Sequence, residues 1–165
     1  AIVLCLTVVL GQACNQNQLT EKNTPETVTI ENSVKKTENH GAIHLTKDDF
    51  ISKVWDYESS PDKWVYKGDK PCIIDFYADW CGPCKIAAPI LEELAVEFKD
   101  AIYVYKIDTE QERELAGAFG IRSIPAFLYC PAEGDPQMAA GIGKTPEQTK
   151  EMFVNVINEF LLAKK

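Results

Sequence analysis

Two cysteines near the middle of the chain have the spacing of a reactive dithiol. Cys81 and Cys84 are separated by Gly82 and Pro83, with an apolar run before them and a helical pattern after them. Residues i and i+3 of a helix have neighbouring Cβ atoms, so the two sulfurs can form a disulfide and open it again without a large backbone movement. The spacing therefore predicts thiol–disulfide exchange at this pair.

The place of the pair at the start of a helix predicts different roles for its two sulfurs. The first turn of a helix presents unpaired N–H groups and the positive end of the dipole, which stabilise a thiolate and lower its pKa. Cys81 is therefore predicted to be the nucleophile and Cys84 the resolving thiol, which should be the less exposed of the two. Pro83 suits the first turn, because its missing N–H would have no partner there. An inert structural disulfide is the alternative.

Composition limits what else the protein can bind. The chain of 165 residues carries 17 Lys and Arg against 25 Asp and Glu, a formal charge of −8, and has no basic stripe. This argues against nucleic acid and anionic membrane surfaces as main partners. A zinc site normally needs a second C-x-x-C pair or nearby histidines, but the only histidines, His40 and His44, are distant in sequence. We therefore expect no metal and no cofactor.

The first residues have the features of an export signal. Residues 2–10 form an apolar run broken only by Thr7, which is too short to span a bilayer but fits the hydrophobic region of a secretory signal trimmed at its start. Gly11-Gln12-Ala13 then precede Cys14, as in a bacterial lipoprotein signal, where the cysteine is lipidated. Cleavage near Ala13 to give a soluble secreted protein, or a buried apolar strand, are the alternatives. We expect an extracytoplasmic protein, in the bacterial periplasm or anchored at Cys14.

The chain is expected to have three parts. Residues 1–14 are the remnant of the signal, and residues 15–41 are rich in Asn, Gln, Thr, Glu and Lys. Such a polar segment buries too little apolar area to offset the entropy of ordering it, which predicts a flexible tether. Residues 42–165 are expected to form one α/β domain.

The elements of this domain alternate and then end in a hairpin. We expect a short strand at Ile43, strands over residues 72–78, 102–107, 126–130 and 137–140, and helices after Thr46, after Cys84, over 110–119 and from Pro146. The helix after Cys84 is expected to carry an apolar stripe of Ile86, Ile90, Leu94 and Phe98, which recur every four residues, with Leu91 and Ala95 beside them. The order predicts a central mixed sheet of four to five strands with helices on both faces.

These segments resemble the thioredoxin family. The stretch Asp75-Phe-Tyr-Ala-Asp-Trp-Cys-Gly-Pro-Cys-Lys85 is similar to the family's active site, and further matches are Pro89, Lys106-Ile-Asp108, Gly120-Ile-Arg-Ser-Ile-Pro125 and Gly141. The similarity covers about residues 42–162 and implies the thioredoxin fold. It also implies a monomeric thiol–disulfide oxidoreductase that acts on disulfide-containing protein clients.

The resemblance implies roles for residues around the dithiol. Asp75 matches a buried aspartate that relays a proton to or from Cys84 through water, and Lys106 matches a lysine that faces it. Pro125 matches a cis-proline that exposes the neighbouring backbone for strand-like pairing with a client. The residues that match the apolar groove around the sulfurs are Trp80, Gly82, Pro83, Ile124 and Gly141. The alternatives are a turn residue for Asp75, a solvated side chain for Lys106 and core filling for Trp80.

Two cysteines are additional to the motif. If their strands pair antiparallel, as the resemblance implies, Cys72 and Cys130 lie close together. They then form a second disulfide or redox pair, or remain two buried thiols that behave as small apolar side chains.

The dipeptide between the cysteines bears on the direction of electron flow. Gly82-Pro83 matches reducing thioredoxins, whereas the expected location favours oxidation. We predict a reductant of extracytoplasmic clients that receives electrons from a membrane thiol carrier. A periplasmic thiol oxidase or disulfide isomerase is the alternative, and a non-catalytic binding module with the same fold is an alternative from a different class.

Overall fold

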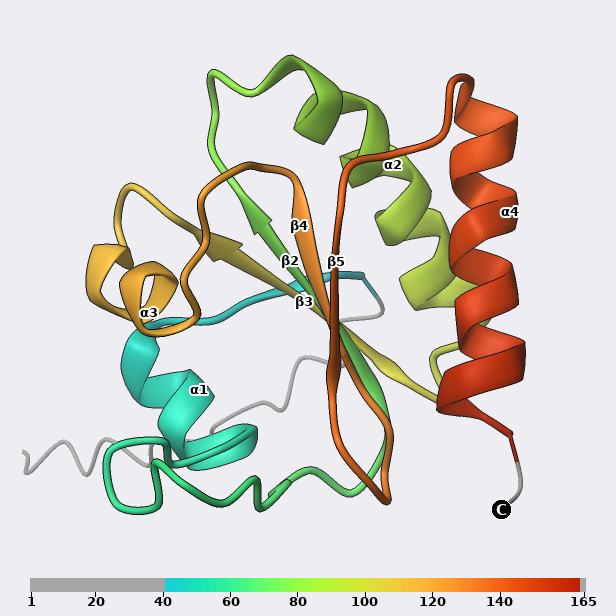
Figure 1. The fold of residues 1–165 in the computed structure, drawn as a ribbon. Coiled ribbons are helices and arrows are strands. Elements are labelled where there is room, and N and C mark those ends of the chain that lie inside the picture. Colours follow the sequence, from blue (N-terminus) through green and yellow to red (C-terminus); the bar gives the residue numbers. More distant parts are fainter. Residues whose placement is uncertain (1–40, 164–165) are drawn as a thin grey trace, which may run out of the picture. The chain divides into compact units, whose positions relative to one another are not determined.

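The centre of the molecule is a five-stranded mixed sheet. The computed structural model describes residues 41–163, so the expectations for the signal, the tether and Cys14 lie outside the described residues. The strands are β1 (Ile43–His44), β2 (Cys72–Tyr77), β3 (Tyr103–Asp108), β4 (Ala126–Cys130) and β5 (Gln137–Ala140). They are arranged in the order β1-β3-β2-β4-β5 (Figure 1). Strand β2 is parallel to β3 and antiparallel to β4, which confirms the predicted mixed sheet.

Helices cover both faces of this sheet. They are α1 (Lys47–Lys53), α2 (Gly82–Glu97), α3 (Arg113–Ala118) and α4 (Pro146–Val156), the last continuing as a π-helical turn, η1 (Ile157–Leu161). Figure 1 shows α1 and α3 on one side of the strands and α2 and α4 on the other. Each side has its own buried apolar cluster against the sheet. Within residues 41–163, no helix combines the length and the apolar character needed to cross a membrane.

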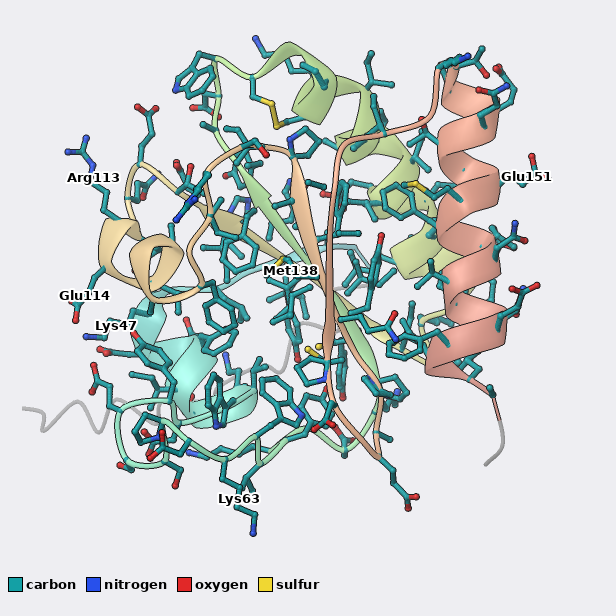
Figure 2. All side chains as sticks on the ribbon, viewed as in Figure 1. Lys47, Lys63, Arg113, Glu114, Met138 and Glu151 are labelled. Atoms are coloured by element: carbon teal, nitrogen blue, oxygen red, sulfur yellow. A yellow bond between two sulfur atoms is a disulfide. The ribbon has the colours of Figure 1, made fainter. Side chains whose placement is uncertain are left out.

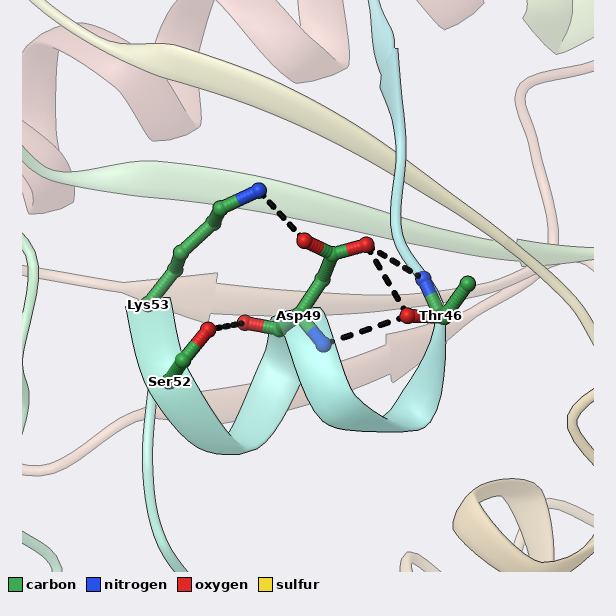
Figure 3. Close-up of polar contacts among 4 residues, drawn as sticks. All are labelled: Thr46, Asp49, Ser52 and Lys53. Carbon is green, nitrogen blue, oxygen red and sulfur yellow. Dashed lines mark hydrogen bonds and ion pairs between the residues drawn. The ribbon is translucent and has the colours of Figure 1, made fainter.

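Local capping fixes the first helix as the sequence predicts. The Thr46 hydroxyl accepts a hydrogen bond from the Asp49 backbone N–H at 3.2 Å, and the Asp49 carboxylate accepts one from the Thr46 N–H at 3.3 Å. Lys53 forms an ion pair with the same carboxylate one turn later (Figure 3). These contacts satisfy N–H groups that the helix leaves without a partner, which is why α1 begins after Thr46.

Strand β2 is the central element of the sheet. All its residues from Cys72 to Phe76 are at most 1% exposed, because strands lie on both sides and helices on both faces. A nearly continuous apolar run is what such a position requires. Its one charged residue, Asp75, is therefore held in an apolar environment.

The apolar face of α2 differs from the predicted one at its first position. Ile86 is 43% exposed, whereas Ala87, Ile90, Leu91 and Leu94 are buried. A strict four-residue repeat turns by about 40° per step on a helix of 3.6 residues per turn. The buried stripe follows the true helical period, so the prediction for Ile86 was wrong.

Two other elements begin later than predicted. The Asp108 carboxylate accepts hydrogen bonds from the Glu110 N–H at 2.9 Å and from the Gln111 amide at 2.7 Å, and α3 starts only at Arg113. This side-chain turn competes with the helix for the same residues. Strand β3 starts at Tyr103, since the N–H of the preceding residue is bound to the Phe98 carbonyl at the end of α2.

The additional cysteines are opposite each other in the sheet, as predicted. Cys72 pairs with Cys130 in the antiparallel register of β2 and β4. Both thiols are free and fully buried. Burial raises the pKa of Cys130, and a hydrogen bond with Cys72 raises it further. Of the two hypotheses, the structure agrees with a pair of buried thiols.

Candidate active site

The predicted dithiol lies at the start of α2, directly after the central strand. Cys81 is the N-cap of the helix, and its sulfur accepts a hydrogen bond from the Cys84 backbone N–H at 3.2 Å. The two residues form a disulfide, with a Cα–Cα separation of 5.3 Å (Figure 2). Gly82 and Pro83 complete the first helical turn. The Cys81 sulfur thus occupies the place where helix N–H groups and the dipole stabilise a thiolate.

The two cysteine residues do not differ in exposure as expected. Cys81 and Cys84 are each 3% exposed in the disulfide form. What distinguishes Cys81 in this state is its position at the N-cap of α2.

Asp75 and Lys106 come together beneath the dithiol. They are partners in the parallel register of β2 and β3. A cavity of about 380 Å³ is lined by both side chains and by Cys84. Within the described part of the chain, neither carboxylate oxygen of Asp75 has a hydrogen-bond partner. A buried, unpartnered carboxyl that shares a cavity with the resolving cysteine can exchange a proton with it through water.

The environment of Asp75 makes its carboxyl a proton acceptor near neutral pH. Burial raises the pKa of Asp75 from 3.8 to about 7, and the positive charge of Lys106 opposes this rise. Desolvation destabilises the carboxylate more than the lysine stabilises it. Asp75 is 1% exposed, which excludes the alternative of a solvated turn residue.

Sequence reasoning missed the partner of Lys106. Its ammonium group forms an ion pair with Glu92 at 3.1 Å, and the other Glu92 oxygen accepts a hydrogen bond from the Ala42 N–H at 2.8 Å. Glu92 lies on α2 eight residues after Cys84. No local pattern in the sequence indicates this contact, because it depends on how α2 packs over β3. Glu92 holds the ammonium group in place, so Lys106 is not the solvated side chain of the alternative.

A second part of the site surrounds the predicted cis-proline. The Ile124–Pro125 peptide bond is cis. The Pro125 carbonyl accepts a hydrogen bond from the Gly141 N–H at 2.9 Å, and Gly141 has φ +84°, a value that favours glycine. Among residues 41–163, neither the N–H nor the carbonyl of Ile124 has a backbone partner. An extended polypeptide can therefore pair with Ile124.

Trp80 faces solvent beside the dithiol. Its side chain is 68% exposed, which excludes the alternative of core filling. With Ile124 it lines an open groove of about 530 Å³. Gly82 and Pro83 are exposed next to it. The predicted client-binding residues thus gather on one surface next to the sulfurs.

No group of three or more His, Cys, Asp or Glu side chains that could hold a metal ion is present among the described residues. The groups that the site does contain are two sulfurs that can interconvert between dithiol and disulfide, a carboxyl that takes up protons near neutral pH, and exposed backbone groups beside an aromatic surface.

Comparison with known proteins agrees with this chemistry. The family model described as thioredoxin matches residues 42–159. The chain is 41% identical over 119 residues to the thioredoxin of Borreliella burgdorferi, which covers 72% of this chain and 97% of the relative. It is 34% identical over 105 residues to the thioredoxin of Porphyra purpurea, covering 64% of this chain and 94% of that protein.

A solved structure supports the fold. The crystal structure of chloroplastic thioredoxin z matches with a TM-score of 0.55 at 22% identity, covering 72% of this chain and 96% of that one. At this identity the match concerns the fold alone, and it agrees with the mixed sheet between two layers of helices.

The raised pKa of Asp75 predicts a pH-dependent cost to stability. Because the folded protein binds this proton more tightly than the unfolded chain, the cost is absent below pH 3.8 and grows as the pH rises towards about 7. Asp75→Asn should therefore raise the free energy of unfolding of the oxidised protein by about 2–4 kcal/mol more at pH 8 than at pH 4. Denaturant titrations at the two pH values measure this difference. Asp100→Asn, at an exposed position, is the matched control, and an equal effect of Asp75→Asn at both pH values would contradict the assignment.

Proposed function

Because the chain belongs to the thioredoxin family, we propose that its Cys81–Cys84 pair reduces disulfides of extracytoplasmic client proteins. The observation that carries this proposal is the Cys81 sulfur at the N-cap of α2, which accepts the Cys84 N–H. This position activates one sulfur of the pair as a thiolate. The clients are disulfide-containing proteins, and the chemistry needs no cofactor.

In the first step, the Cys81 thiolate attacks one sulfur of a client disulfide. The client S–S bond breaks as a bond forms between Cys81 and the attacked sulfur, and the other client sulfur leaves as a thiolate that takes a proton from water. The client strand pairs with the free backbone groups of Ile124 and packs against Trp80. These contacts place the attacked sulfur in line with Cys81.

In the second step, Cys84 resolves the mixed disulfide. Its thiol transfers a proton to the Asp75 carboxylate through water in the shared cavity, and the resulting thiolate attacks the Cys81 sulfur. The second client sulfur leaves as a thiolate, and the Cys81–Cys84 disulfide forms. Two electrons have passed from the dithiol to the client. Lys106, held by Glu92, limits how far the pKa of Asp75 rises.

The proposed location follows from the N-terminal residues. The apolar run over residues 2–10 and the cysteine at position 14 support export and a lipid anchor at Cys14, with the protein acting as a monomer at the membrane surface. Outside the cytoplasm, a membrane thiol carrier supplies the electrons that return the disulfide to the dithiol. Gly82-Pro83 between the cysteines supports reduction as the net direction.

Reductase activity should depend on each cysteine of the pair in a different way. In an insulin-reduction assay with dithiothreitol, Cys81→Ser should lower turnover to the uncatalysed background, since the nucleophile is gone. When the reduced Cys84→Ser variant is mixed with insulin after removal of dithiothreitol, it should stop at the mixed disulfide, which gel electrophoresis without reductant detects. Cys130→Ala, which removes a buried thiol away from the pair, is the control and should keep its turnover. Full activity of Cys81→Ser would favour a non-catalytic binding module.

The redox potential separates a reductant from an oxidant. Equilibration of the protein with thiol–disulfide buffers should give a potential near about −270 mV, the value of reducing thioredoxins. Alkylation of the free dithiol followed by mass spectrometry measures the reduced fraction. A potential near about −120 mV, the value of a strong periplasmic oxidant, would instead support the oxidase alternative.

The lipid anchor predicts a modified cysteine. When the full protein is produced in a bacterium with its natural start, Cys14 should become the acylated first residue, and the protein should sediment with membranes. Mass spectrometry of the N-terminal peptide and cell fractionation measure both properties. Cys14→Ser should lack the acyl group. An unmodified Cys14 in the processed wild-type protein would contradict the anchor and support the soluble secreted form.

A further inference from the structure

The arginines of the chain are both located at the client groove. Of the 17 basic residues in the sequence, only Arg113 and Arg122 are arginines. Both line the open groove of about 530 Å³ that Trp80 and Ile124 also line. Both are exposed, and Figure 2 shows the Arg113 side chain extending outward from α3. In a protein with a formal charge of −8, this places two planar cations in the groove that Trp80 lines.

The two guanidinium groups are available to a ligand. The Nε of Arg113 donates a hydrogen bond to the Glu110 carbonyl at 3.0 Å, which leaves the outer edge of the group open. Arg122 makes no hydrogen bond with any residue between 41 and 163. Within the same residues, neither arginine belongs to an ion pair.

The acidic residues closest to Arg113 in sequence are held by other partners. Glu114 forms an ion pair with the Lys47 ammonium group at 2.8 Å, and Glu112 accepts a hydrogen bond from the Lys47 backbone N–H at 3.0 Å. Figure 2 shows the Glu114 side chain next to Lys47 and the Arg113 side chain, at the start of α3, away from both. Both carboxylates thus contact Lys47 at the start of α1 and do not form an ion pair with Arg113.

Arginine is well suited to bind a carboxylate in this setting. Its planar group presents two parallel N–H donors to the two oxygens of one carboxylate. Exposed tryptophan and arginine together are also typical of residues that dominate binding energy at protein interfaces. An acidic polypeptide would be repelled by most of the surface of a protein with a charge of −8, but not by this groove.

We propose that the groove selects clients in which aspartate or glutamate side chains flank the reactive disulfide. Arg113 and Arg122 bind these carboxylates, while Trp80 packs against the chain next to the client cysteine. The inference rests on the proposed disulfide reductase function and adds the client class to it. Among client disulfides of similar redox potential, the groove thereby favours those with acidic side chains next to the cysteines.

The test uses two peptide disulfides that differ only in charge. Each is a disulfide-linked peptide pair with amidated ends, in which two glutamates or two glutamines flank each cysteine. Stopped-flow fluorescence gives the second-order rate constant for reduction of each peptide by the reduced protein. The measured quantity is the ratio of the glutamate rate to the glutamine rate, and comparing this ratio between variants cancels the intrinsic reactivity of the peptides.

Removal of the arginine charges should lower this ratio. We expect a decrease of about threefold to tenfold in the Arg113→Gln, Arg122→Gln double variant and a smaller decrease in each single variant, as expected for exposed charge pairs. Lys63→Gln is the matched control, because it removes one exposed positive charge at a residue that does not line the groove. The ratio of this control should equal that of the wild type. Raising the salt concentration from 0.05 to 0.5 M should lower the wild-type ratio by screening the attraction to the arginines. It should not lower the ratio of the double variant, in which only repulsion by the overall negative charge remains to be screened.

Other outcomes separate this inference from the proposed function. If the wild type and the double variant give the same ratio while both peptides are reduced, client selection by the arginines is wrong and the reductase function stands. An equal decrease in the Lys63→Gln variant would attribute the effect to overall charge and also overturn the inference. If the reduced wild-type protein reduces neither peptide, the reductase function itself is overturned.

Discussion

The hydrogen bond from the Cys84 N–H to the Cys81 sulfur is the interaction on which the site depends. It exists because the chain leaves the central strand, makes a turn in which the Cys81 N–H is bound to the Ala78 carbonyl at 3.1 Å, and enters α2 at once. The buried side chains of α2, among them Ala87 and Leu91, fix the helix against the sheet. The N-terminus of the helix and the sulfur that it activates are therefore held in one place by the core.

Burial of Asp75 in the central strand lowers the stability of the folded protein when the carboxyl is charged. The dithiol follows a central strand that is covered on both faces, so a polar side chain in this strand loses its contact with solvent. Asp75 lies there without a hydrogen-bond partner in the described structure, which raises its pKa to about 7. The same desolvation that lowers stability gives the carboxyl a proton affinity useful at neutral pH. The burial of this one residue therefore lowers the stability of the fold and, in the proposed mechanism, also favours proton transfer.

The sequence is most informative where a contact is local or where a motif resembles a known family. The capping of α1 by Thr46 and Asp49 joins residues three apart and depends on a short pattern. The resemblance to a family placed the dithiol, the carboxyl and the cis-proline. It also supplied the antiparallel strand pairing that brings Cys72 opposite Cys130.

What could not be predicted depends on how elements pack and on competition between local contacts. The ion pair of Lys106 with Glu92 requires the orientation of α2 over β3, which no local pattern specifies. The late start of α3 results from the Asp108 carboxylate, which binds groups that a helix would otherwise order. The sequence also did not indicate that Arg113 lines the groove, because this depends on how α3 is positioned beside the loop that carries Arg122.

In the proposed mechanism, proton transfer and client binding use different parts of the site. The cavity that contains Asp75, Cys84 and Lys106 shares no lining residue with the groove that contains Trp80 and the two arginines. Cys84 lines the cavity, and Trp80, which lines the groove, directly precedes Cys81 in the sequence. A substitution in the groove can therefore change which disulfides are bound without changing the environment of the carboxyl.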